Sequence, residues 1–178
     1  MSTTTTGSSA ARKSWKDEAP SALIAHILGT HHAYTRGELD RLQALIGSVR
    51  ELHEARHPEL ILVGSLLARL CADLLPHMQK EETILFPFIE ALEQGTQPPF
   101  GPASVAMPVR VMMLEHESAE LVLAELRCVT SGYSIPEDAC VTYRALFDGL
   151  QDLEADLAEH IHLENNVLFP KALAMEAG

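Results

Sequence analysis

The chain contains one pattern twice, as ADLLPHMQKEETILFP at residues 72–87 and as ADLAEHIHLENNVLFP at residues 155–170. Aligned without gaps, both copies read A-D-L-x2-H-x3-E-x2-[IV]-L-F-P. Residues four apart lie on one face of an α-helix, about 6 Å apart along its axis. The Asp, His and Glu of each copy therefore form a column on one face, and a His and a Glu at this spacing can bind the same metal ion.

The His-x3-Glu spacing alone is a weak signal, because a chain with nine histidines produces such pairs by chance. An aspartate four residues before the histidine is a much rarer addition, and only the two copies have it, as Asp73 and Asp156. The matching apolar residues around both copies strengthen the signal. We therefore predict that the two copies are metal-binding segments. The spacing occurs at three places: His77–Glu81, His116–Glu120 and His160–Glu164.

From Pro20 onward, apolar residues recur at helical spacing, and clusters of Pro and Gly divide the chain into four segments. The predicted helices run from 21 to about 56, from 58 to about 93, from between 104 and 108 to about 131, and from about 136 to 170 or slightly beyond. Four long helices with short connections favour an all-α, up-down-up-down four-helix bundle. We expect this bundle over residues 20–178, after a disordered Ser/Thr-rich tail over residues 1–19.

Two metal-binding columns on the second and fourth helices need partners on the first and third. On the third helix, His116 lies in the middle of an apolar stripe, so its imidazole faces the core. On the first helix the candidates are His31 and His32. Periodicity does not separate these two residues, because each continues a different set of apolar positions.

Helix lengths give an independent test of which histidines share a layer. In an antiparallel bundle with a rise of 1.5 Å per residue, His32, His77 and His116 come to a similar height. His160 fits the same layer if the last connection is longer or the fourth helix starts nearer Val141. Four histidines are not expected to be ligands. His53 and His57 lie ~30 Å away along the helices, and His26 and His162 are surface or flanking residues.

The predicted centre contains four imidazoles and two carboxylates. This is too many donors for one small ion and suits two ions, with each Glu bridging and two His on each metal. Mixed nitrogen and oxygen donors select iron, manganese or zinc over calcium, whose sites are built from oxygen. Each ion then has room for a bridging oxo or hydroxo group and for a small ligand.

Three acidic residues are expected to support the ligands from outside. Each repeat aspartate, Asp73 or Asp156, lies one turn before its histidine, where a carboxylate can accept the second ring N–H of the ligand. Glu120 is placed in the same supporting role beside His116.

Charge and composition exclude several classes of function. The net charge of −12 repels phosphate groups, so neither nucleic acid nor an anionic membrane is expected as a partner. No uninterrupted apolar run approaches the ~20 residues of a membrane span. Three cysteines without C-x-x-C spacing fit a reducing compartment, and the N-terminus has no apolar block like that of a signal peptide. We expect a cytoplasmic protein, as a monomer or homodimer.

The motifs resemble the hemerythrin-like (HHE) di-iron domain of the repair-of-iron-centres family, over about residues 20–173. The two repeats and LEHESAE at residues 114–120 carry this resemblance. It implies a hemerythrin-like bundle that holds two non-haem iron ions, bridged by an oxo or hydroxo group and by the carboxylates of Glu81 and Glu164. It also places the ligand of the first helix at His32 rather than His31. The implied ligand set is His32, His77, Glu81, His116, His160 and Glu164.

The resemblance implies a role in nitrosative and oxidative stress, through repair of damaged iron–sulfur clusters or iron supply to them, or through nitric oxide handling and reduction. The implied partners are oxygen, nitric oxide and iron–sulfur proteins. The alternative is a module that binds oxygen or nitric oxide without catalysis, but four histidines in place of an oxygen carrier's five favour reactivity. A purely structural bundle would leave buried polar groups unsatisfied at about 1–3 kcal/mol each. Longer family members begin with a small domain bearing adjacent cysteines, where this chain has its Ser/Thr-rich tail.

Overall fold

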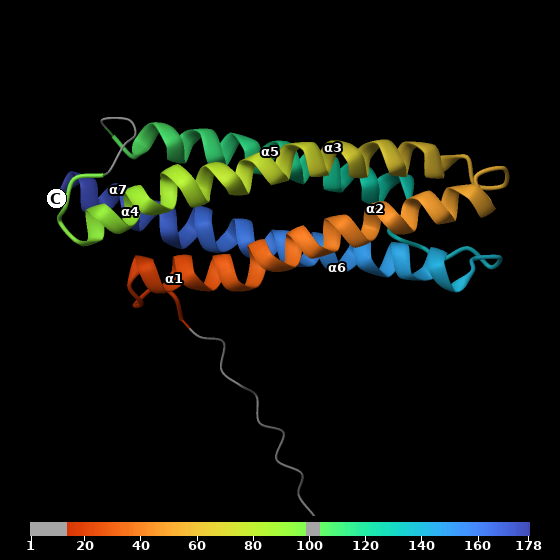
Figure 1. Cartoon of the computed structure of the whole chain (residues 1–178), viewed down its shortest axis with the longest axis horizontal. Coiled ribbons are helices and arrows are strands. Elements are labelled where there is room, and N and C mark those ends of the chain that lie inside the picture. Colours follow the sequence, from red (N-terminus) through yellow and green to blue (C-terminus); the bar gives the residue numbers. More distant parts are fainter. Residues whose placement is uncertain (1–13, 99–103) are drawn as a thin grey trace, which may run out of the picture.

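A computed structural model describes residues 14–98 and 104–178 and shows a four-helix bundle (Figure 1). No strand occurs in these two ranges. α2 packs against α3 and α6, and α3 packs against α5. The first long helix comprises α1 (Pro20–His26), η1 (Ile27–His32) and α2 (Ala33–His53), the second α3 (Glu59–Lys80), η2 (Glu81–Leu85) and α4 (Phe86–Glu93), the third α5 (Ala106–Val129), and the fourth α6 (Val141–Leu163), η3 (Glu164–Leu168) and α7 (Phe169–Ala177).

Three of the four long helices contain a π-helical stretch, and each stretch includes or begins at a predicted ligand. Two of them, η2 and η3, lie directly before the Phe-Pro pairs that end the repeats. Pro87 and Pro170 have no N–H to donate, and in a regular α-helix their rings clash with the carbonyl four residues earlier. A wider turn relieves this clash. Such bulges are frequent at functional sites, and the repeat therefore sets the helix geometry as well as the ligands.

The core consists of two apolar clusters, one on each side of the layer that holds the predicted ligands. One cluster joins α2, α3, α5 and α6 and includes Leu67, Leu126 and Phe147. The other joins α1, η1, η2, α4, α5, η3 and α7 and includes Ile27 and Phe86. Because both clusters exclude water, the polar layer between them is buried as well.

The helix boundaries agree with the sequence prediction except at the fourth helix. This helix begins at Val141 rather than near Pro136, after a connection over residues 130–140. The later start removes the mismatch in height between His160 and the other predicted ligands. The helix also continues past Pro170 to Ala177, because the π-helical turn accommodates the proline ring. α3 likewise runs through Pro76 to Lys80.

Most of the predicted tail, residues 1–13, lies outside the described residues. Within the described part of residues 1–19, the ring of Trp15 stacks on the ring of His26 with 4.6 Å between centroids. Lys171 of α7 donates to the backbone carbonyls of Trp15 and Glu18. Packing on the bundle therefore begins at Trp15, five residues before α1.

One helix, Glu59–Glu93, is long and apolar enough to cross a membrane by length and composition. The same helix carries His77 and Glu81, and it packs against α2 and α5 within the bundle. A core helix passes the same test, so its position between two neighbours explains its apolar composition.

Candidate metal centre

The structure brings the six predicted ligands together in one buried layer. Glu81 and Glu164 are 0% exposed, and none of the four histidines is more than 2% exposed. Their ligand atoms form two groups of four within which all atoms lie within 4.8 Å of one another: His32, Glu81, His160 and Glu164, and His77, Glu81, His116 and Glu164.

Each glutamate belongs to both groups and directs one oxygen to each. Glu81 Oε2 lies 3.3 Å from His32 Nε2, and Glu81 Oε1 lies 3.3 Å from His77 Nε2. Glu164 Oε1 lies 3.2 Å from His160 Nε2, and Glu164 Oε2 lies 3.1 Å from His116 Nε2. Two carboxylates that each span two pairs of imidazoles have the arrangement needed to bridge two metal ions.

The converging atoms lack hydrogen-bond partners. Both carboxylate oxygens of Glu81 and of Glu164 are buried without one, as are the Nε2 atoms of His32 and His160. The remaining two Nε2 atoms, of His77 and His116, face each other at 3.1 Å. An unsatisfied buried polar atom costs about 1–3 kcal/mol, so this many in one layer require a further partner. A pair of cations fits, because every orphaned atom is a metal donor.

The electrostatics of the layer also favour added positive charge. Burial disfavours the imidazolium of His77, but the nearby carboxylates of Glu81 and Glu115 outweigh it and raise its pKa to about 9. Burial likewise opposes the charged form of His160, and Glu164 raises its pKa. The neighbouring histidines hold the pKa of Glu164 below its usual range despite its burial. In the absence of a metal, protons on the histidines supply the positive charge that two carboxylates demand.

Comparison with known families supports the same interpretation. The hemerythrin HHE cation binding domain matches residues 23–172. The chain belongs to this family. All six buried residues of the HHE centre lie within the matched range.

Relatives of this HHE chain are named as iron–sulfur cluster repair proteins. A probable iron-sulfur cluster repair protein of Haemophilus influenzae is 36% identical over 90% of this chain and 69% of its own length. The iron-sulfur cluster repair protein YtfE of Dickeya chrysanthemi is 37% identical over 92% of this chain and 71% of its own length. YtfE of Escherichia coli is 36% identical over the same shares.

In the HHE centre, the repeat also positions the histidines of the two neighbouring helices. Glu82, which follows Glu81, accepts a hydrogen bond from His32 Nδ1 at 2.8 Å. Asn165, which follows Glu164, contacts His116 Nδ1 through its Oδ1 at 3.0 Å. These two residues occupy equivalent positions in the repeat. Neither was predicted from the sequence, although a polar residue after both glutamates was a visible signal.

The Phe of each L-F-P ending stacks on the histidine that the same repeat contacts on a neighbouring helix. Phe86 packs on the ring of His32 with 5.7 Å between centroids, and Phe169 packs on His116 with 6.0 Å. Each repeat therefore supplies a His and a Glu of its own and holds the histidine of the neighbouring helix with a polar side chain and an aromatic ring. This shared geometry explains why the two copies match so far beyond the His-x3-Glu spacing.

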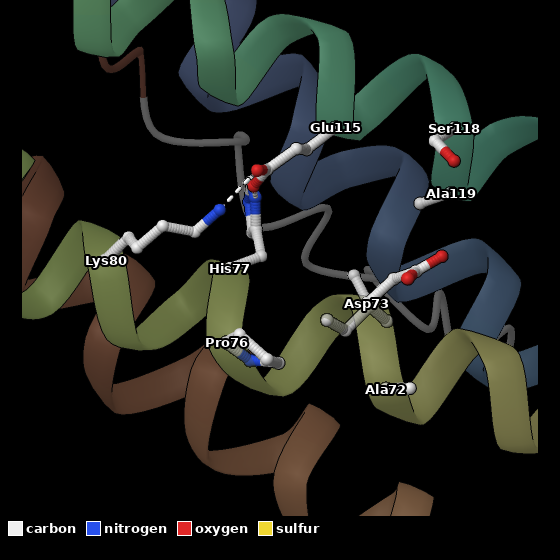
Figure 2. A pocket seen from close by; sticks show the side chains of 9 residues that line it. Ala72, Asp73, Pro76, His77, Lys80, Glu115, Ser118 and Ala119 are labelled. Carbon is white, nitrogen blue, oxygen red and sulfur yellow. Dashed lines mark hydrogen bonds and ion pairs between the residues drawn. The ribbon is translucent and has the colours of Figure 1, made fainter.

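His77 is oriented by Glu115 from across the helix interface. Glu115 Oε2 accepts from His77 Nδ1 at 2.9 Å, and Lys80 forms an ion pair with the other carboxylate oxygen. Figure 2 shows His77 and Lys80 on α3 pointing toward Glu115 on α5. Burial opposes ionisation of Glu115, but Lys80 and His77 outweigh it and lower its pKa. These residues line a depression of about 260 Å³ that reaches His77 from the surface.

The structure does not bring the three acidic residues predicted to support the ligands into contact with the predicted ligand histidines. Asp73 is 45% exposed and lies 3.7 Å from Arg69, pointing away from His77 (Figure 2). Asp156 accepts from His31 rather than His160, and Glu120 is exposed. The same physical reason applies to all three acidic residues. A residue one turn away lies on the same helix, whereas the outer ring nitrogens of His32, His77 and His116 face neighbouring helices.

The structure separates the adjacent His31 and His32. His32 enters the layer, whereas His31 donates from Nδ1 to Asp156 Oδ1 at 3.0 Å. The ring of His31 stacks on His160, 5.4 Å between centroids. His160 Nδ1 is buried without a hydrogen-bond partner, so stacking replaces the polar contact that orients the other three histidines.

Proposed function

We propose that this chain is a non-haem di-iron protein that takes part in the repair of damaged iron–sulfur clusters. The observation that carries the proposal is the pair of glutamates, each with one oxygen in both groups of donors. Membership of the HHE family and the names of the relatives support iron as the metal and cluster repair as the role.

In this proposal the first ion is held by His32 and His160 and the second by His77 and His116. Glu81 and Glu164 would each offer one carboxylate oxygen to either ion. The bound iron pair would supply redox chemistry and open positions for oxygen or nitric oxide. Each ion has two imidazoles and two carboxylate oxygens from the protein, a donor set that suits iron and leaves it incompletely coordinated.

The surrounding residues fix the donors in place and limit the water around them. Glu82 and Glu115 each hold a histidine by its outer nitrogen, which keeps the inner nitrogen free for metal and increases its basicity. The apolar clusters on both sides keep the layer dry. The depression beside His77 offers a short route for a diatomic ligand, and the Lys80–Glu115 ion pair lines it.

Iron–sulfur proteins are the partners that this role requires, and the cytoplasm is the compartment we propose. The net charge of −12 includes the two buried glutamates, which two bound cations neutralise. The remaining acidic surface disfavours nucleic acid as a partner.

Iron content and reactivity test the proposal together. We expect two iron atoms per chain in the purified protein. When the reduced protein is mixed anaerobically with nitric oxide in a stopped-flow spectrometer, we expect turnover or loss of iron. In a parallel assay, an iron–sulfur enzyme inactivated by nitric oxide should recover activity as iron leaves this protein.

The competing function gives a different result. A stable and reversible nitric oxide or oxygen adduct, with iron retained and no recovery of the damaged enzyme, supports a binding module and contradicts repair. One iron per chain, or zinc alone, contradicts the di-iron centre itself. Glu120→Ala serves as a control that removes an exposed carboxylate from the same helical spacing.

Metal binding by this centre is expected to release protons at neutral pH. The pKa of His77 is about 9 in the metal-free protein, so at pH 7 its ring is protonated, whereas a metal ligand must be neutral. Affinity for Fe²⁺ should therefore rise with pH up to about 9 and fall on acidification. Anaerobic calorimetry in buffers of different ionisation enthalpy measures the release. Heats that do not depend on the buffer at pH 7 would contradict this pKa.

A further inference from the structure

A second group of potential metal ligands lies at the other end of the bundle. His53 is the last residue of α2, His57 lies in the turn before α3, and Asp138 lies in the connection between α5 and α6. One ligand atom from each of the three lies within 4.8 Å of the others. Both connections are at the end of the bundle opposite the C-terminus (Figure 1). From His32 to His53, α2 rises about 30 Å, so the group is separate from the HHE centre.

Two of the three residues are already in contact. His57 Nε2 lies 2.9 Å from Asp138 Oδ1, and His57 Nδ1 lies 3.0 Å from Glu59 Oε1. Arg56 pairs with the other oxygen of Asp138, at 3.1 Å, which leaves Oδ1 directed at the histidine. The hydrogen bonds of Asp138 and Glu59 raise the pKa of His57, so the two carboxylates favour a positive charge at this imidazole.

Buried polar atoms without partners provide the second observation. His53 is only 5% exposed, and its Nδ1 has no hydrogen-bond partner. The ring of Tyr143 contacts both histidines, with centroids 5.3 Å from His53 and 5.5 Å from His57, and its buried hydroxyl also lacks a partner. A cavity of about 290 Å³ lies against His57, Glu59 and Tyr143. The group therefore has unsatisfied polarity and adjoining space.

We propose that His53, His57 and Asp138 bind one divalent transition-metal ion of the zinc class. Two imidazoles and a carboxylate are a donor set typical of zinc, which accepts three protein ligands and a fourth from water or a further carboxylate. Glu59 is near enough to His57 to provide that carboxylate. Calcium and magnesium are disfavoured because they prefer oxygen donors.

The bound ion would add a link between three segments that the ring of Tyr143 and exposed ion pairs already bring together. It links the end of α2, the turn to α3 and the connection from α5 to α6, which spans residues 130–140. The exposed ion pairs that now hold this connection contribute little in water. A ligand that binds only the folded protein stabilises it by mass action, so zinc here would stabilise the end of the bundle remote from the iron centre.

The test uses the iron-loaded protein and zinc chloride alone. Protein with its iron content measured is equilibrated with zinc at about pH 8, because metal ligands must be deprotonated, and passed through a desalting column. We expect one zinc ion per chain beyond the unchanged iron, and a higher midpoint of thermal unfolding. His57→Ala and Asp138→Asn should weaken zinc binding by at least about tenfold and abolish the thermal shift, while retaining iron.

Matched variants separate this site from other sources of zinc binding. His162→Ala removes an exposed histidine of α6 and should leave zinc binding unchanged. His53→Gln removes the buried donor and provides a second test with a residue of similar size. Zinc binding that is equal in the wild type, His57→Ala and Asp138→Asn would overturn the proposal. Zinc that enters only as iron leaves would overturn it as well, since the ion would then occupy the HHE centre.

Discussion

Glu81→Ala and Glu164→Ala are each expected to yield protein with neither iron ion, compared with two per chain in the wild type. Each carboxylate directs one oxygen to each group of donors, so a single substitution removes a ligand from both ions. It also removes half of the anionic charge that offsets two buried cations. The remaining carboxylate and four neutral imidazoles would leave that positive charge largely uncompensated in a layer without water. Metal analysis after desalting measures the loss.

Two controls make this result specific to the bridging role. Glu120→Ala removes a glutamate with the same spacing to its histidine, but the side chain is exposed, so both irons should remain. Glu81→Gln preserves side-chain volume and should still lower the iron content, which distinguishes lost charge from a cavity in the core. Circular dichroism checks that each variant is folded. A Glu81→Ala protein that is folded and retains two irons would contradict the bridging arrangement.

The sequence was sufficient to predict the bundle and the His–Glu pairs of the second and fourth helices, because both depend on spacing along a helix. The four-residue interval between His77 and Glu81 places both on one face of the second helix. The choice between His31 and His32 was different. Both face inward from η1, and only the family resemblance favoured His32, since a π-helical stretch alters the periodicity on which the choice depends.

The residues that orient the ligands were not predictable in the same way, because their partners lie on other helices. Glu115 reaches His77 across the interface of α3 and α5, and no spacing along one helix encodes this contact. Asp73 had the right spacing but points to the surface. Glu82 and Asn165 are the two orienting residues for which the sequence offers a signal, since each is the polar residue that directly follows the glutamate of its repeat.

Removal of both metal ions is expected to lower the midpoint of thermal unfolding by about 10 °C or more. Ions that bind only the folded state at 1,000 times their dissociation constant contribute about 4 kcal/mol, and a domain of this size shifts by about 2–4 °C per kcal/mol. The buried carboxylate oxygens and ring nitrogens explain the direction, because without cations they have no hydrogen-bond partner in the layer. Chelation followed by calorimetry, with iron content measured on the same sample, tests this expectation.

The Glu164→Ala variant provides the matched control for metal removal. Since it is expected to hold no iron, a chelator should not lower its unfolding temperature further, whereas the wild type should fall toward a metal-free value. Adding Fe²⁺ anaerobically should restore the wild type but not the variant, and Mg²⁺ should restore neither, because the histidine donors disfavour it. A metal-free wild type that unfolds at the same temperature as the iron-loaded protein would contradict the expectation. It would mean that protons on His77 and His160 compensate the two glutamates as well as metal does, since these are the groups whose pKa values the carboxylates raise.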